Sequence, residues 1–363
     1  MRIFRLTALL VALAPSATAQ VEIHLVISKK ANMKGELEDL ASFGLLKETT
    51  CDSDGNIYAP SNRKYGDAIN AILRIAPDAK SYTQFSIDPL PKLEDGHIID
   101  FVLEPSGDIY VLARQVLTYS KLEVPIQFGE TFIIHYAKSG NVVSQIRLAL
   151  DTNGFEPTGL AVLEAGEYLV VGFRRAEDKV IVLAQTFRLD GNMKAKLKLG
   201  HEGTKASNLG SVRSLRVIHP VAIKANGSIY VMRGTTSEPI YILSESGQLR
   251  KTLLLKQPGL EFDSPHILKN DLIVNQHRLI PAENRGITFR SGPERVNLPV
   301  FDLETGELVR EYYWHEETMG IACYSSHEAL TFIGQDVGSF PSGWALFYAK
   351  PASPAKPKGR TTP

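Results

Sequence analysis

The chain has 363 residues, 44% of them hydrophobic, and its 40 basic and 40 acidic side chains give a formal net charge of zero. This length can bury a substantial core, and the charge balance provides no overall attraction to nucleic acid or to an anionic membrane surface. Any charged binding site must therefore be local.

Residues 1–19 have the pattern of a secretory signal peptide. Arg2 and Arg5 precede a short apolar run, and the small residues Ala17 and Ala19 mark a cleavage site before Gln20. The apolar run is far shorter than the roughly 18 residues that a membrane span requires. The sequence therefore predicts a secreted or periplasmic protein with no membrane span. An uncleaved N-terminal anchor is the alternative.

A short turn-and-strand pattern recurs along the rest of the chain. A polar turn, ending in Gly in the clearest copies, leads into an apolar pair such as Ile-Tyr, which is typical of a β-turn that feeds a strand. The copies occupy residues 52–60, 105–110, 164–169, 225–230, 269–273 and 326–330. A second strand-turn-strand unit follows each of the first five copies, so a complete repeat is predicted to hold four strands.

Four-stranded units that recur about every 40 to 50 residues, lengthened by loops, are typical of propeller blades. The sequence predicts an all-β, six-bladed β-propeller of four-stranded antiparallel blades over residues 20–350. The sixth repeat has only three predicted strands, so we expect the unattached strand 21–27 to complete that blade and close the ring. Residues 351–363 are rich in Pro, Lys and Thr and are expected to form a disordered tail.

The turn 54–58, Asp-Gly-Asn-Ile-Tyr, with the following strand 72–75, resembles NHL-type repeats and the wider TolB-like six-bladed propellers of exported bacterial proteins. The resemblance covers nearly all of the mature chain. It implies the fold and says little about function. One feature differs, because such repeats often carry Asp three residues after the Tyr, where this chain has Ser61, Ala113 and Arg233.

The two cysteines, Cys51 and Cys323, stand at matching positions of the first and last repeats. If those repeats are neighbours in a closed ring, a disulfide bond between the two cysteines would hold the ring closed in an oxidising compartment. Two buried free thiols are the alternative.

Five of the six repeats carry an arginine shortly after the second strand, on the face expected around the channel mouth. These residues are Arg63, Arg114, Arg174 with Arg175, Arg233 and Arg278. Guanidinium groups bind carboxylate, phosphate or sulfate through paired hydrogen bonds, so a converging set predicts a site for a small anionic ligand. The alternative is that the arginines form ion pairs with acids of the loops that enter each first strand. Those acids are Glu48, Glu94, Asp95, Glu156, Asp263, Glu316 and Glu317.

Histidines gather near the same loops, at His97, His219, His266 and His315. Imidazoles beside carboxylates can ligate a metal or act as a general base, although packing histidines would look the same in sequence. Aligning the repeats gives no ring of histidines, because the equivalents of His219 are Lys47, Ile99, Thr158, Ser264 and Met319.

Glu48 is superficially similar to the first-blade Glu of gluconolactonase-type propellers. A metal-dependent propeller hydrolase, lactonase or lyase centred on Glu48, His219 and His266 is therefore the alternative function. The favoured function is a non-enzymatic exported propeller that binds a ligand or a protein partner at its arginine-lined face. No cofactor and no nucleic acid are expected, and the protein is expected to be a monomer.

Two long insertions, at residues 113–131 and 276–296, interrupt the second and fifth repeats. Loops of this length are uncommon in compact domains unless they are functional. They are expected either to rim the channel mouth or to be ordinary variable decoration.

Overall fold

The structure is a computed structural model. It describes residues 19–30, 50–61, 69–77, 81–94, 96–118, 127–151, 154–176, 179–200, 219–276, 296–314, 323–324, 330–336 and 343–351. Within these ranges the protein consists of strands β1 to β24 with turns and bends between them, and no helix is present. The described residues accordingly include no helix that could cross a membrane.

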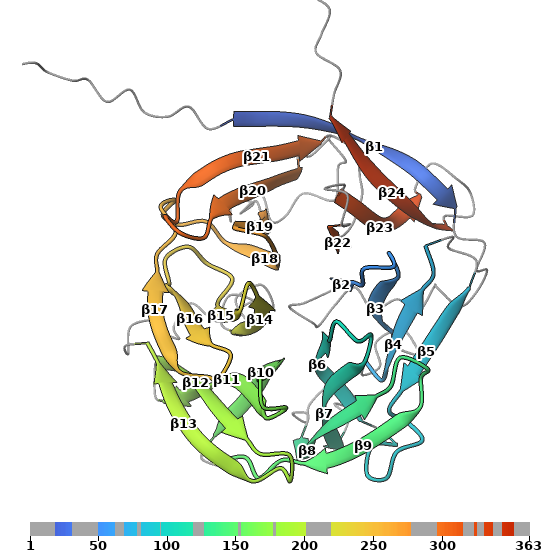
Figure 1. Cartoon of the computed structure of the whole chain (residues 1–363), viewed down its shortest axis with the longest axis vertical. Helices are drawn as coiled ribbons and strands as arrows, with labels where there is room; N and C mark the ends of the chain where they lie inside the picture. Colours follow the sequence, from blue (N-terminus) through green and yellow to red (C-terminus); the bar gives the residue numbers. More distant parts are fainter. Residues whose placement is uncertain are drawn as a thin grey trace, which may run out of the picture.

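The strands form five sheets arranged around a ring (Figure 1). Four of the sheets have four antiparallel strands each, in sequence order. The first contains β2 (Thr50–Cys51), β3 (Ile57–Ser61), β4 (Ala71–Ile75) and β5 (Tyr82–Ser86). The second contains β6 (His97–Leu103), β7 (Ile109–Thr118), β8 (Gln127–Tyr136) and β9 (Val142–Arg147). The third contains β10 (Phe155–Val162), β11 (Tyr168–Ala176), β12 (Lys179–Phe187) and β13 (Met193–Leu199). The fourth contains β14 (Val221–Ala225), β15 (Ser228–Met232), β16 (Ile240–Ser244) and β17 (Leu249–Leu253).

The fifth sheet has eight strands in the order β18-β19-β20-β21-β1-β24-β23-β22. Its strands from the fifth repeat are β18 (Phe262–Leu268), β19 (Asp271–Gln276), β20 (Val296–Asp302) and β21 (Leu308–Trp314). Those from the sixth repeat are β22 (Cys323–Tyr324), β23 (Leu330–Asp336) and β24 (Gly343–Pro351). Between the two groups lies β1 (Ala19–Lys30), the N-terminal strand.

The predicted propeller of four-stranded antiparallel blades is confirmed, but the predicted number of six blades is wrong, because the described strands form five sheets. The cause is β1. This strand pairs antiparallel with β24 from Ile23 onward, and its first residues pair parallel with β21. Since β1 hydrogen-bonds along both edges, it joins the strands of the last two repeats into one sheet.

The repeated turn is stabilised within itself, which explains why the pattern is visible in sequence. In the first copy, the carboxylate of Asp52 accepts hydrogen bonds from the backbone N–H and side-chain amide of Asn56 and from the hydroxyl of Tyr58. In the fourth copy, Asn226 and Gly227 both have positive φ, of 51° and 66°. Two consecutive positive φ values are the geometry of a tight two-residue hairpin, which Asn-Gly favours. In these two copies, local contacts and backbone geometry therefore set the turn and the start of the next strand.

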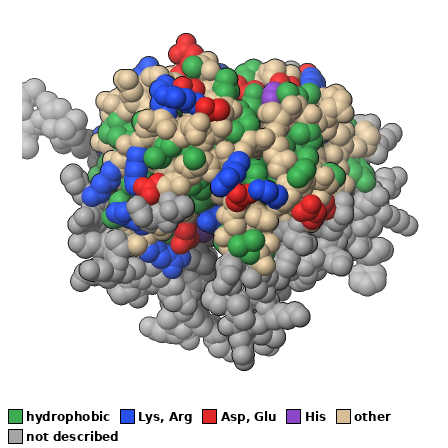
Figure 2. Space-filling model, turned by 90° about the horizontal axis from the view of Figure 1, so that it is seen from below, with side chains coloured by type: hydrophobic (Ala, Val, Ile, Leu, Met, Phe, Trp, Pro, Cys, Tyr) green, Lys and Arg blue, Asp and Glu red, His purple; other side chains and the backbone are tan. Residues whose placement is uncertain are grey.

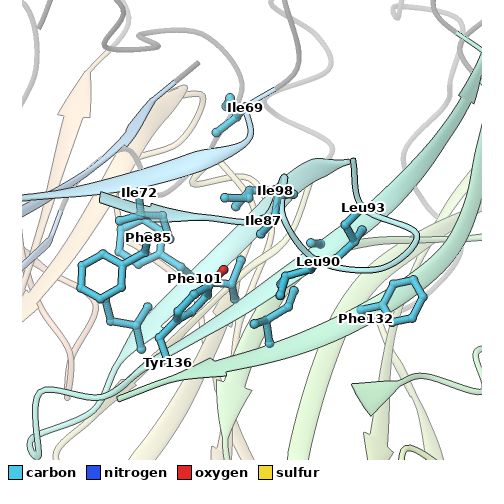
Figure 3. Close-up of a cluster of buried hydrophobic side chains, with 14 of the residues drawn as sticks. Ile69, Ile72, Phe85, Ile87, Leu90, Leu93, Ile98, Phe101, Phe132 and Tyr136 are labelled. Atoms are coloured by element: carbon cyan, nitrogen blue, oxygen red, sulfur yellow. The ribbon is translucent and has the colours of Figure 1, made fainter. Parts of the chain in front are cut away.

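The hydrophobic core lies between neighbouring sheets. Figure 3 shows the cluster between the first and second sheets, where Ile72 and Phe85 lie close to Phe101 and Tyr136. The rings of Phe85 and Tyr136 meet edge to face, with centroids 5.7 Å apart. Similar clusters fill the space between the second and third, third and fourth, and fourth and fifth sheets. This packing holds each inner strand in place relative to the inner strands of the adjacent sheets.

The first and last sheets meet at the strands that carry the cysteines. Strand β2 lies next to β22. Cys51 of β2 is disulfide-bonded, and Cys323 of β22 is the only other cysteine of the chain. The ring therefore has a covalent bond near its closure point, in addition to the hydrogen bonds of β1.

Several expectations fall outside the described residues. The predicted signal peptide lies there apart from Ala19, which begins β1, and so do residues 352–363 of the predicted tail. The described surface in Figure 2 carries Lys and Arg interspersed with Asp and Glu, as the zero net charge leads one to expect.

Candidate functional site

A small cavity of about 140 Å³ lies where the inner parts of the second, third and fourth sheets meet. Its walls come from β6, β7, β8, β10 and β11 and from His219, two residues before β14. The lining residues are His97, Ile99, Arg114, Phe128, Glu156, Pro157, Thr158, Phe173 and His219. Three of them, Ile99, Thr158 and His219, occupy the same position of their respective repeats when the repeats are aligned. The inner strands thus bring three repeats together at this point.

Arg114 is the cation of the cavity. It lies on β7, directly opposite His97 of β6, and is partly buried. Its guanidinium carbon is 4.8 Å from the centroid of the Phe128 ring. Among the described residues, Nε of Arg114 makes no hydrogen bond and no carboxylate lies within ion-pair distance of its side chain. Burial lowers the pKa of Arg114, and the more distant charge of Glu156 acts in the opposite direction.

Glu156 is the carboxylate of the cavity. It lies near the start of β10, and about half of its side chain is exposed. Its Oε1 is 3.9 Å from Nε of Arg175, at the edge of ion-pair distance. The Arg175 guanidinium also lies over the Phe173 ring, 5.7 Å from its centroid. Because Arg175 is the nearer cation, Glu156 compensates the charge of Arg114 only in part.

The two histidines of the cavity are neutral at neutral pH. Burial lowers the pKa of His97 to about 4. Burial also lowers the pKa of His219 to about 4, and the charges of Arg175 and Arg233 contribute in the same direction. The backbone N–H of Ile69 donates a hydrogen bond to Nδ1 of His97, so the proton of this neutral ring is on Nε2. The His219 ring stacks on Phe173, with centroids 5.1 Å apart.

The cavity is framed by hydrogen bonds that join the inner strands of different sheets. The hydroxyl of Thr158 donates to the carbonyl oxygen of Pro220, just before β14. The carboxylate of Asp100, which is 2% exposed, accepts from the backbone N–H of Leu160. Because these bonds cross between sheets, the walls of the cavity have a fixed spacing.

The predicted ring of arginines is only partly assembled. Arg63 and Arg278 lie outside the described residues. Arg174 lies on β11 opposite Phe155 and does not line the cavity. Arg233 is 4% exposed, and its guanidinium is 3.2 Å from Glu238 of the same sheet. Of the four predicted arginines that are described, which include Arg175, Arg114 alone lines the cavity.

The residues of the metal hypothesis are described only in part. Glu48 lies outside the described residues, and His266 of β18 does not line the cavity that contains His219. No group of three or more His, Cys, Asp or Glu side chains within the described part of the chain is placed to hold a metal ion.

The predicted insertion at residues 113–131 contributes a wall of the site. Strands β7 and β8 extend into it, ending at Thr118 and beginning at Gln127, and Val116 pairs with Phe128. This hairpin carries both Arg114 and Phe128. The other insertion, residues 276–296, lies almost wholly outside the described residues.

The sequence contains no signal for Phe173 as a site residue. Phe173 lies in β11 and is 0% exposed, and in sequence it looks like any aromatic residue of a hydrophobic core.

A larger cavity of about 470 Å³ opens on the opposite side of the ring, among the repeated turns. The cation that lines it, Lys224, lies 3.9 Å from Glu104 of the second sheet and 3.9 Å from Glu245 of the fourth. Its charge is therefore shared between two carboxylates, whereas that of Arg114 has no carboxylate at ion-pair distance among the described residues. This contrast makes the smaller cavity the better candidate for a binding site.

Comparisons with known proteins show the fold and no family. No protein-family model matches the chain, and no curated protein matches it in sequence. A crystal structure of a protein of unknown function from Dyadobacter fermentans is similar, with a TM-score of 0.52 and 9% identity over 91% of this chain and 99% of that one. The phage phi92 endosialidase is similar with a TM-score of 0.50 and 10% identity, over 94% of this chain and 71% of the endosialidase. At these identities the likeness supports the β-propeller fold alone.

Proposed function

We propose that the protein is a non-enzymatic, exported β-propeller that binds a small anionic ligand, or an anionic group of a protein partner, in the cavity that contains Arg114. The observation that carries this proposal is a partly buried guanidinium that lines a cavity and has no carboxylate at ion-pair distance among the described residues. A guanidinium presents a planar set of N–H donors that matches a carboxylate or phosphate group. Partial burial strengthens such a contact, because the surroundings screen charge less than water does.

The size of the cavity supports a small ligand or a single inserted group. At about 140 Å³ it is well below the roughly 300–1,000 Å³ of pockets that enclose drug-sized molecules. An acidic side chain or a terminal carboxylate of a protein partner would also fit a cavity of this size.

Two features support export. Residues 1–19 have the composition of a signal peptide, and Cys51 is disulfide-bonded. Disulfide bonds persist in oxidising compartments and are rare in the cytosol.

The experiment compares acetate binding to the wild-type protein and to the variant Arg114→Gln by ligand-observed NMR. Acetate presents the anionic group alone, and this method detects millimolar affinities. Loss of a charge-assisted hydrogen-bonding partner is expected to weaken acetate about 10- to 100-fold.

The matched control is Arg147→Gln. Arg147 is 66% exposed and pairs with Glu130 away from the cavity, so this variant removes the same charge from the surface and should bind acetate like the wild type. Both variants must retain the wild-type melting temperature within a few degrees. Equal acetate binding by wild type and Arg114→Gln, or no binding by the wild type, contradicts the proposal.

A further inference from the structure

We infer that the anion taken by the Arg114 cavity is a monoanionic carboxylate attached to a small flat apolar group, as in a benzoate-type acid. This inference rests on the proposed function and specifies the ligand class of the same site. Three properties of the cavity lead to it: its charge, its hydrogen-bond donors and its walls.

The charge balance favours one negative charge on the ligand. The cavity is lined by one cation, Arg114, and one carboxylate, Glu156, and the adjacent Arg175 offsets Glu156. The two histidines add no charge at neutral pH, because burial lowers the pKa of each. Among the described residues, one positive charge therefore remains. A dianionic phosphate would leave its second charge uncompensated in a partly buried site, which is unfavourable.

The donors suit a planar group with two oxygens. The Arg114 guanidinium lies against the Phe128 ring, and this contact restricts the plane of its N–H fork. His97 contributes a second donor from another strand, since its Nδ1 accepts the hydrogen bond from Ile69 and its Nε2 carries the proton. A guanidinium and a neutral imidazole N–H together can bind both oxygens of a carboxylate.

The remaining walls are apolar and partly aromatic. Phe128 and Phe173 lie on different sheets, and the His219 ring is stacked on Phe173 with an interplanar angle of 19°. Ile99 and Pro157 add further apolar surface. Flat rings on the walls favour a flat apolar ligand group, because stacked and edge-to-face contacts add to the free energy of burial. A carboxylate with no such group would leave the Phe128 side chain, which is 39% exposed, in contact with water.

The test measures the affinities of benzoate, acetate and inorganic phosphate at equal ionic strength and pH 7.5 by ligand-observed NMR. We expect benzoate to bind at least about tenfold more tightly than acetate, and phosphate to bind more weakly than acetate. Phe128→Ala should weaken benzoate about fivefold or more and should weaken acetate less, because acetate loses the restraint on Arg114 but no contact with the ring.

The matched control is Leu117→Ala, which truncates an exposed apolar side chain of the same hairpin outside the cavity and should change neither affinity. Equal affinities for benzoate and acetate, or preferential binding of phosphate, would overturn the aromatic-acid inference while leaving anion binding intact. A wild-type protein that binds none of the three overturns the proposed function as well, so the two failures are distinguishable.

Discussion

The centroid of the Phe128 ring lies 4.8 Å from the guanidinium carbon of Arg114, and both residues belong to the β7–β8 hairpin. The hairpin thus positions the cation of the cavity without help from the arginines of other repeats. The neighbouring sheets contribute the other walls, with Glu156 and Phe173 from the third sheet and His219 from the start of the fourth. Changes in the packing between sheets should therefore alter the cavity while leaving the Arg114–Phe128 contact in place.

Gly172→Ala should damage the site through the backbone. A Cβ at Gly172 would lie 2.1 Å from the carbonyl oxygen of Glu156, so the start of β10 must move. We expect a loss of roughly 1–3 kcal/mol of stability, typical of overpacking, together with weaker acetate binding. Urea unfolding and the NMR titration measure the two effects.

The control is Gly129→Ala, where the added Cβ would meet mainly the ends of the flexible side chains of Gln115 and Leu117. Those side chains can turn away, so this variant should lose well under about 1 kcal/mol. If both glycine variants are equally stable, the close approach of Gly172 to Glu156 has no energetic consequence.

Because the pKa values of His97 and His219 are lowered, the folded protein should lose stability in mild acid. Each has a folded-state pKa of about 4, below the ordinary value of 6.5, so the unfolded chain binds more protons between these pH values. Their contribution to stability is complete above pH 6.5 and is lost as the pH falls through 4. Between these two pH values, the free energy of unfolding should fall with decreasing pH by up to about 1.4 kcal/mol per pH unit for each histidine.

Urea unfolding at pH 7.5, 6.0 and 5.0 measures this slope before most carboxylates titrate. His219→Phe removes one of the two groups and should reduce the slope by about half. A wild-type stability that does not change from pH 7.5 to pH 5.0 would show that these histidines are not held neutral.

Glu238→Gln should destabilise the fourth sheet by roughly 2–4 kcal/mol, because it removes the carboxylate 3.2 Å from the buried Arg233 guanidinium. The comparison is Glu307→Gln. Its partner Lys256 forms an ion pair in which both side chains are more than half exposed, so the expected cost is below about 1 kcal/mol. Equal effects of the two substitutions in urea unfolding would mean that Arg233 does not depend on Glu238.

Reduction of the disulfide bond should destabilise the closed ring. Non-reducing peptide mapping is expected to recover the peptide containing Cys51 joined to the one containing Cys323. The double variant Cys51→Ala, Cys323→Ala should lose roughly 2–5 kcal/mol, as is usual for native disulfides. Its melting temperature should also stop responding to reductant. A wild-type melting temperature that is the same with and without reductant would contradict this role for the bond.

The fold class was predictable because its determinants are local. The Asp52 carboxylate caps its own turn, and Asn226-Gly227 sets a hairpin with no help from distant residues. The number of sheets was not predictable, since it depends on whether the first residues of β1 reach β21, nearly the whole chain away. A strand pattern indicates that an edge exists and does not indicate what pairs with it.

The site was predictable in part. Arg114 was recognised because an arginine follows the second strand in five of the six repeats. Glu156, His97 and His219 were recognised because acids and histidines gather near the loops that enter the first strands. Arg174 and Arg233 occupy similar places too, yet neither lines the cavity, and Arg233 is buried against Glu238. The direction of a long side chain depends on packing between sheets, so repeat position alone could not distinguish an arginine that lines the cavity from one that is buried in an ion pair.

The pairing of β1 also constrains the order of events during synthesis. β1 is the first described strand to leave the ribosome, whereas its partners β21 and β24 are among the last. The four sheets between them can form from neighbouring segments as the chain emerges. Closure has to wait for residues 308–314 and 343–351, so each edge of β1 remains available to other chains until its own partner strand has been synthesised.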